Sequence, residues 1–145
     1  MDWLLGIIGK IKGHRLYVIA TGDDADAAVN LAEAFALSNP ATRIYNEMRP
    51  HGKTGAEIDV MVRRLKLLAR SEAVPVVLLV RLAVPDSTKR PALTDLPGTW
   101  EVEAHADIVI AMHGSPIRPI VIKNRHGAIS PHGETEKGPK ILAKR

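Results

Sequence analysis

Short apolar runs, bounded by glycine, proline or polar residues, recur along the chain and predict β-strands. The runs at residues 16–21 and 74–82 are almost continuously apolar, as is typical of strands buried on both faces of a parallel sheet. A Gly-Ser-Pro tripeptide at 114–116 separates the last two runs and predicts a β-hairpin. The expected strands cover residues 16–21, 42–48, 74–82, 107–113 and 117–123.

Two segments between these runs carry apolar residues at helical spacing. Residues 25–37 begin among aspartates, which suit the positive end of a helix dipole. Residues 56–72 combine one apolar face with a largely basic opposite face. The positions expected to face the core are Ala28, Leu31, Ala32 and Phe35 in the first helix, and Ile58, Met61, Val62, Leu65, Leu68 and Ala69 in the second.

This order of segments predicts an α/β domain with a mainly parallel sheet flanked by helices and a C-terminal antiparallel hairpin. Residues 83–105 are polar, rich in proline and without a clear period, so we expect a long loop there. Five strands with only two strong helices leave part of a parallel sheet uncovered. We therefore expect residual apolar surface and a partner or a second copy to bury it.

Composition narrows the class of protein. A chain of 145 residues suits one domain with its own core, and the absence of cysteine excludes disulfides and thiolate chemistry. No apolar run reaches the length that crosses a bilayer, and the first residues lack the features of a secretory signal. We therefore expect no membrane contact and a cytoplasmic location. The six histidines form no metal-binding pattern, so we expect no metal site.

The net charge of +4 is concentrated at the C-terminal end. Residues 113–145 hold seven Lys or Arg against two Glu, whereas residues 1–112 hold thirteen basic and fourteen acidic residues. A basic segment of this kind suits a polyanion such as DNA, and a solvated tail kept for solubility is the other interpretation. The nucleic-acid-binding candidates are Lys89, Arg90, Arg118, Lys137 and Lys140.

The sequence RPHGKTG at residues 49–55 has the Gly-Lys-Thr of a phosphate-binding loop but not its spacing. The first glycine of a Walker loop would fall on Glu47, and Pro50 removes an N–H donor where donors are needed. The turn at residues 21–29 (TGDDADAAV) stands in the right architectural position, but it offers carboxylates and no lysine, and negative charge repels phosphate. An atypical phosphate site at Lys53 and Thr54 remains a weaker alternative.

MDWLLGIIG…GHRLYVIAT and VNLAEAFAL resemble the first strand, and the helix after the Walker loop, of the RecA-like C-terminal motor domain in the DnaB family of replicative helicases. The chain looks like a shortened form of this domain. EIDVMVRRLKLLARSEAVPVVLLVRL resembles a helix–strand unit, and KRPALTDLPGTWEVEAHADIVIAMH the segment that follows it. IVIKNRHGAI is similar to the late hairpin that carries Lys-x-Arg-x-Gly. The resemblance runs over most of residues 1–129.

The departures from the family pattern concern the nucleotide site. The interval that holds a Walker loop in the family is GDDADAA here, and the region of the family's catalytic glutamate is missing. Residues 42–48 occupy the Walker B position without its aspartate, and Glu47 is out of place. Val80-Arg81-Leu82 stands where the family has Ser-Gln-Leu. The resemblance therefore implies a degenerate domain in which both Walker motifs are lost.

The part of the family's site that acts in trans is retained. Lys123 and Arg125 match the Lys-x-Arg-x-Gly motif, whose basic residues reach a neighbouring subunit's γ-phosphate in the family. Two ordinary basic residues on an exposed strand are the alternative. Lys89 and Arg90 match the Lys-Arg-Pro at the family's DNA-contacting loop, although the polar stretch after them is changed.

These features predict a non-catalytic DnaB-like protein of DNA replication or its regulation. We expect it to bind a helicase ring, its own copies or DNA, and to use no cofactor. The alternatives are a small NTPase that uses ATP and magnesium at residues 52–54, and a simple basic nucleic-acid-binding protein. A decayed paralogue without a task is also compatible with the sequence. We expect the domain to cover residues 1–129, with a basic flexible tail at 130–145.

Overall fold

The structure is a computed structural model. It describes residues 11–22, 25–47, 54–82, 88–97 and 99–129. Its centre is a five-stranded sheet with the strand order β2-β3-β1-β4-β5. The first four strands in this order are parallel, and β5 is antiparallel to β4. The strands are β1 (Leu16–Thr21), β2 (Arg43–Glu47), β3 (Val76–Arg81), β4 (Ile108–His113) and β5 (Arg118–Asn124).

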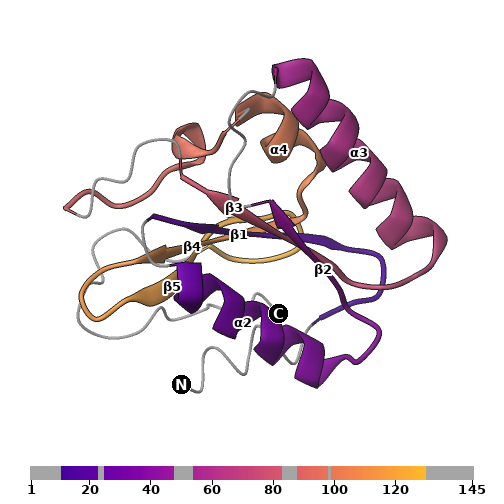
Figure 1. Cartoon of the computed structure of the whole chain (residues 1–145), viewed down its shortest axis with the longest axis horizontal. Coiled ribbons are helices and arrows are strands. Elements are labelled where there is room, and N and C mark those ends of the chain that lie inside the picture. Colours follow the sequence, from indigo (N-terminus) through magenta and orange to yellow (C-terminus); the bar gives the residue numbers. More distant parts are fainter. Residues whose placement is uncertain (1–10, 23–24, 48–53, 83–87, 98, 130–145) are drawn as a thin grey trace.

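Helices lie on both faces of this sheet, with α3 and α4 on one side and α2 on the other (Figure 1). Their bounds are α2 (Ala25–Ser38), α3 (Gly55–Ser71) and α4 (Thr99–His105), and a short 3-10 turn, η1, spans Leu93–Asp95. The expected α/β architecture with a C-terminal antiparallel hairpin is therefore confirmed.

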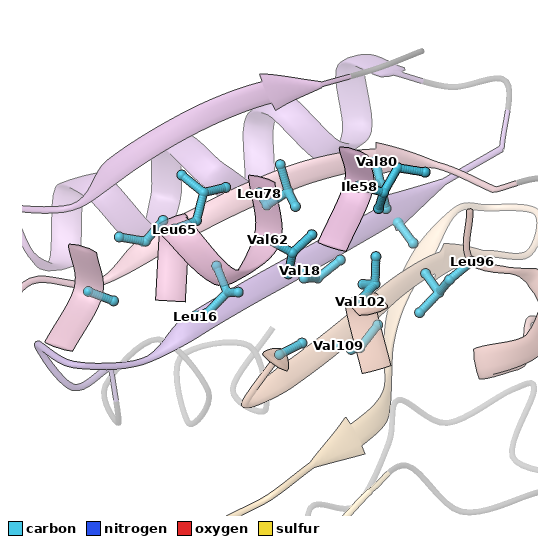
Figure 2. Close-up of a cluster of buried hydrophobic side chains, with 14 of the residues drawn as sticks. Leu16, Val18, Ile58, Val62, Leu65, Leu78, Val80, Leu96, Val102 and Val109 are labelled. Carbon is cyan, nitrogen blue, oxygen red and sulfur yellow. The ribbon is translucent and has the colours of Figure 1, made fainter. Parts of the chain in front are cut away.

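Alternating side chains of the two central strands divide the core between the faces. Leu16, Val18 and Ala20 of β1 point toward α3 and α4, where they pack with Val62 and Val102 (Figure 2). Tyr17 and Ile19 point the other way and pack against α2. The ring centroids of Tyr17 and Phe35 lie 5.2 Å apart in a tilted arrangement that favours aromatic pairs.

The expected helix faces are confirmed at nearly every position. Ala28, Leu31, Ala32 and Phe35 of α2 are all buried. In α3 four of the six predicted positions are buried, and Met61 and Leu68 are partly buried against the same cluster. The spacing of apolar residues was sufficient to predict these buried positions, because each helix packs on the sheet through one continuous stripe of apolar side chains.

The expectation of a long loop at residues 83–105 was wrong, because α4 and η1 lie within it. Helix α4 has seven residues, too few for a helical period to be visible in sequence. It forms because Val102 and the following Ala106 are buried against α3 and the sheet, so tertiary packing rather than intrinsic helicity stabilises it.

Some apolar surface stays exposed, as expected. Tyr45 and Ile44 of the edge strand β2 are 38% and 40% exposed, and Val60 of α3 is 46% exposed. The other exposed large apolar residues in the described part of the chain are Leu37, Leu67, Ile117 and Ile129. Whether a partner covers this surface stays a prediction.

Candidate functional site

The two residues of the Lys-x-Arg motif lie at the edge of the sheet where the parallel strands begin. Because β5 runs antiparallel, its last residues lie beside the first residues of β4: Lys123 is opposite Val109. One residue beyond β5, the backbone N–H of Arg125 donates to the carbonyl oxygen of Asp107 at 2.8 Å. We call Lys66, Asp107, Lys123, Arg125 and His126 the amino-edge cluster.

Asp107 is the buried carboxylate at the centre of the amino-edge cluster, with its side chain 2% exposed. Its Oδ2 accepts hydrogen bonds from the backbone N–H of Leu16 at 2.8 Å and from Lys66 Nζ. Its Oδ1 lies 3.3 Å from a guanidinium nitrogen of Arg125 and 3.6 Å from His126 Nε2. The carboxylate therefore ties α3, β1 and the end of β5 together.

The pKa of Asp107 is lowered although the group is buried. Burial by itself raises the pKa, because it penalises the charged form. The hydrogen bonds from Lys66 and from the Leu16 N–H, together with the charges of Lys66 and Arg125, outweigh that effect. Asp107 is therefore ionised near neutral pH.

Lys123 and Arg125 both bind the C-terminal end of α4. Lys123 Nζ donates to the carbonyl oxygen of Glu103, and a guanidinium nitrogen of Arg125 donates to that of Ala104 at 2.7 Å. These are carbonyls of the last helical turn, where cations are favoured by the helix dipole. Burial lowers the pKa of Lys123, and the neighbouring charge of Arg125 lowers it further. Both side chains therefore reach the same helix end, and their joint action on a phosphate of another chain stays a prediction.

The amino-edge cluster has an excess of positive charge. Lys66, Lys123 and Arg125 are three cations, and the carboxylates that act on them are those of Asp107 and, at Lys123, of Glu103 as well. The Arg125 side chain is 41% exposed, so part of its guanidinium is open to solvent. A guanidinium has five N–H donors in a planar fork that matches phosphate oxygens. The cluster can therefore bind an anionic group such as phosphate from outside the molecule.

The cluster and the turn after β1 lie at opposite edges of the sheet. The turn follows the carboxyl end of β1, whereas Leu16 at its amino end contacts Asp107. A six-residue strand spans about 20 Å. Lys123 and Arg125 thus lie too far away to serve a phosphate at the GDDADAA turn of their own chain.

The described nucleic-acid-binding candidates come from two separate segments of the chain. Lys89 is exposed and Arg90 partly buried in the segment before η1. Arg118 is partly buried at the start of β5, opposite His113, and so lies at the other end of the hairpin from Lys123. Lys137 and Lys140 lie outside the described residues, as does the expected tail.

Thr54 of the weak phosphate-loop candidate has a structural role. Its side-chain oxygen accepts a hydrogen bond from the N–H of Glu57 at 3.3 Å, and the Glu57 carboxylate accepts one from the Thr54 N–H at 2.6 Å. This reciprocal capping box starts α3. The Glu57 carboxylate occupies the position near the helix N-terminus that a phosphate would need. Lys53 lies outside the described residues.

Asp107 and the capping box are the two features that sequence reasoning missed. Thr-x-x-Glu at 54–57 is a recognisable capping signal just before an apolar periodic segment. Asp107 is a single acidic residue immediately before a buried strand, which is a weak signal without its partners.

In the described part of the chain no three His, Asp or Glu side chains are grouped to hold a metal ion. Over the same residues, no helix is long and apolar enough to cross a membrane.

The parallel sheet with helices on both faces and an antiparallel last strand matches a RecA-like α/β fold. A family model described as the DnaB-like helicase C terminal domain matches residues 43–135, more than half of the chain. The chain therefore belongs to the DnaB-like helicase C-terminal domain family. No curated protein matches significantly.

Solved structures agree on the fold. The structure described as the ATPase domain of G40P has a TM-score of 0.61 at 14% sequence identity, and the match covers 82% of this chain and 80% of that one. A DnaB-like replicative helicase, studied for its interactions with primase, has a TM-score of 0.57 at 14% identity. That match covers 81% of this chain but 55% of the helicase chain.

Proposed function

We propose that this DnaB-like domain acts in DNA replication or its regulation as a subunit that hydrolyses no nucleotide itself. It associates with a replicative helicase ring and presents Arg125, assisted by Lys123, to the nucleotide of a neighbouring subunit. Arg125 stabilises negative charge on the transferring phosphoryl group, as an arginine finger does.

The observation that carries this proposal is the distance between the segment after β1, where a nucleotide of the same chain would bind, and the cations of the amino-edge cluster. The segment between β1 and α2 has no lysine and is rich in aspartate, so it repels phosphate. The amino-edge cluster retains its cations at the opposite edge of the sheet, with the Arg125 guanidinium partly open to solvent. A cationic cluster without a phosphate site in reach on its own chain suits a phosphate bound to another chain.

Arg125 can contact such a phosphate without leaving the amino-edge cluster. One of its nitrogens holds the Ala104 carbonyl and another lies near Asp107, and these contacts fix the guanidinium at the end of α4. Its remaining donors are free to take part in a new hydrogen bond. A pre-positioned side chain loses little entropy when it binds.

The test is a mixture of this protein with the replicative helicase of the same organism. We expect the wild type to co-elute with the helicase and to change its ATPase rate, and Arg125→Ala to keep co-elution but lose the effect. Removing one arginine finger costs about a thousandfold or more in the site it serves. Arg63→Ala, which removes an exposed arginine of α3, serves as the matched control.

Two results would contradict the proposal: no co-elution with the helicase, or the same ATPase rate with wild type and with Arg125→Ala. Because Arg125 also contacts Asp107, Arg125→Lys is measured in parallel. It keeps the positive charge but loses the fork that matches phosphate. If Arg125→Lys unfolds at the same temperature as the wild type but no longer changes the ATPase rate of the helicase, Arg125 acts in trans. If its unfolding temperature falls as well, its role is structural.

A second candidate function is electrostatic binding of nucleic acid, which the net charge of +5 in residues 113–145 favours. It predicts a steep loss of affinity for single- or double-stranded DNA as salt increases. Truncation after Gly127 should abolish that binding. Binding that survives the truncation, or that is insensitive to salt, would exclude this candidate.

A further inference from the structure

The strand β2 forms one end of the described sheet. It pairs with β3 on one side, and no described strand lies on its other side. It carries two half-exposed apolar residues, Ile44 and Tyr45, and contains neither lysine nor proline. Lysine and proline are common on edge strands because they discourage pairing with another chain. The β2 edge therefore has the features of a strand that pairs.

The direction of the backbone groups of β2 follows from its pairing with β3. The N–H of Arg43 donates to the carbonyl oxygen of Pro75, so the backbone of residue 43 faces inward. Because successive residues of a strand face alternate sides, Tyr45 also faces β3. The N–H and C=O groups of Ile44 and Asn46 consequently face the outer edge, where an added strand would bind them.

The charges of β2 select one register for such a strand. The strand reads Arg-Ile-Tyr-Asn-Glu from 43 to 47. In an antiparallel pair centred on Tyr45, Arg43 lies opposite Glu47 of the second copy, and Ile44 lies opposite Asn46. Ile44 and Asn46 are the residues whose backbone groups face outward, so this register also satisfies the hydrogen bonds of an antiparallel ladder. No other register pairs all five residues with opposite charges facing each other.

A groove between β2 and α3 lies beside the same residues. It has a volume of about 450 Å³, and its lining includes Tyr45 of β2 and Val60, Met61 and Leu65 of α3. Positions 43 and 45 share the face of β2 that looks toward α3, because they alternate with 44 and Tyr45 is paired with Leu78 of the core on that face. The tyrosine side chains of two paired copies would therefore meet above this groove and cover the half-exposed Val60.

We propose that two copies of this chain associate through β2, antiparallel and with Tyr45 on the two-fold axis, to form one continuous sheet. The contact is isologous, because each copy contributes the same strand. It is small, so we expect a reversible dimer rather than a permanent one. The amino-edge cluster lies at the other end of the strand order, beside β4 and β5, so the dimer is independent of the proposed function.

Charge exchange tests the register. Analytical ultracentrifugation of the wild type should show a mass rising with concentration from 15.8 kDa toward twice that value. Arg43→Glu or Glu47→Arg alone should weaken the dimer about tenfold or more, since each sets like charges opposite each other twice. The double variant Arg43→Glu/Glu47→Arg should restore it. Arg43 also contacts Glu72 of its own chain at 3.7 Å on the surface. Both Arg43→Glu and the double variant lose this contact, so a difference between these two variants reports the pairing between copies.

A second variant tests the ladder without changing charge. Ile44→Pro removes an N–H that faces away from β3, so the fold should persist while the dimer is lost. Leu37→Ser, at an exposed apolar residue at the end of α2, is the matched control and should leave the dimer intact. A wild type that stays monomeric at millimolar concentration overturns the proposal. So does a dimer that survives both Arg43→Glu and Ile44→Pro, or a double variant that stays monomeric.

Discussion

At the scale of single residues, Asp107 connects three parts of the chain that are distant in sequence. The backbone N–H of Leu16, the ammonium of Lys66 and the guanidinium of Arg125 are 91, 41 and 18 residues away, and all contact its carboxylate. A buried carboxylate with several donors is stabilising only while all of its partners are present. The same residue that orients Arg125 therefore also holds α3 against the sheet.

We predict that Asp107→Asn lowers the free energy of unfolding by about 3 kcal/mol, because Lys66, with its side chain 15% exposed, loses its carboxylate partner. Urea denaturation followed by circular dichroism measures this change. Asp59→Asn is the control: Asp59 is 26% exposed, its partners Arg63 and His105 are more exposed than Lys66, and its loss should cost less than about 1 kcal/mol. Equal losses in the two variants would contradict the role assigned to Asp107.

The pKa of Asp107 adds a dependence on pH to the same experiment. Because the folded-state pKa lies below the ordinary value of 3.8, the carboxylate contributes its full stability above that value. The contribution is lost as the pH falls from 3.8 through the folded-state pKa. The stability difference between wild type and Asp107→Asn should therefore be constant near neutral pH and shrink in strong acid.

At the scale of elements, the start of α3 shows that the Gly-Lys-Thr motif at residues 52–54 has to be interpreted together with the backbone around it. Gly-Lys-Thr before a helix is part of a phosphate-binding loop only when the backbone ahead of it can wrap the phosphate. In this chain Thr54 and Glu57 satisfy each other's backbone N–H groups, and this capping box starts the helix. Helix capping therefore accounts for Thr54 of the motif.

We predict that Thr54→Ala lowers the free energy of unfolding by about 1 kcal/mol through loss of the N-cap. Ser71→Ala at the exposed other end of α3 should change it by less than about 0.5 kcal/mol. Thermal or chemical denaturation provides the comparison. If Thr54→Ala left stability unchanged but abolished binding of Mg·ATP, the alternative of a small NTPase would replace our interpretation.

At the scale of the whole molecule, the strand order separates two potential contact regions. The amino-edge cluster lies beside β4 and β5, and the outer edge of β2 lies at the opposite end of the sheet. The two proposed contacts, with a helicase subunit and with a second copy, would therefore not compete for the same surface.

We predict that millimolar Mg·ATP leaves the melting temperature of the isolated protein unchanged. A nucleotide site of micromolar Kd would add about 4 kcal/mol of stability at a thousandfold excess of ligand, enough to raise Tm by several degrees. Differential scanning fluorimetry with and without Mg·ATP measures this, with an active replicative helicase as the positive control. A rise of several degrees would contradict the proposal that this chain has no nucleotide site of its own.

The sequence by itself determined what depends on neighbouring residues. The buried strands β1 and β3, the inward faces of α2 and α3, and the absence of lysine between β1 and α2 are all visible as local patterns, because strand and helix periods repeat over a few residues. The resemblance of the late hairpin to Lys-x-Arg-x-Gly was visible for the same reason.

Only the tertiary structure decided which of these residues meet. Helix α4 is too short to show a period and forms through packing of Val102, and Lys123 and Arg125 find its last carbonyls only when β5 folds back along β4. The outward direction of Ile44 and Asn46 likewise follows from the pairing of β2 with β3. Such contacts join residues far apart in the chain, and a local pattern carries no information about them.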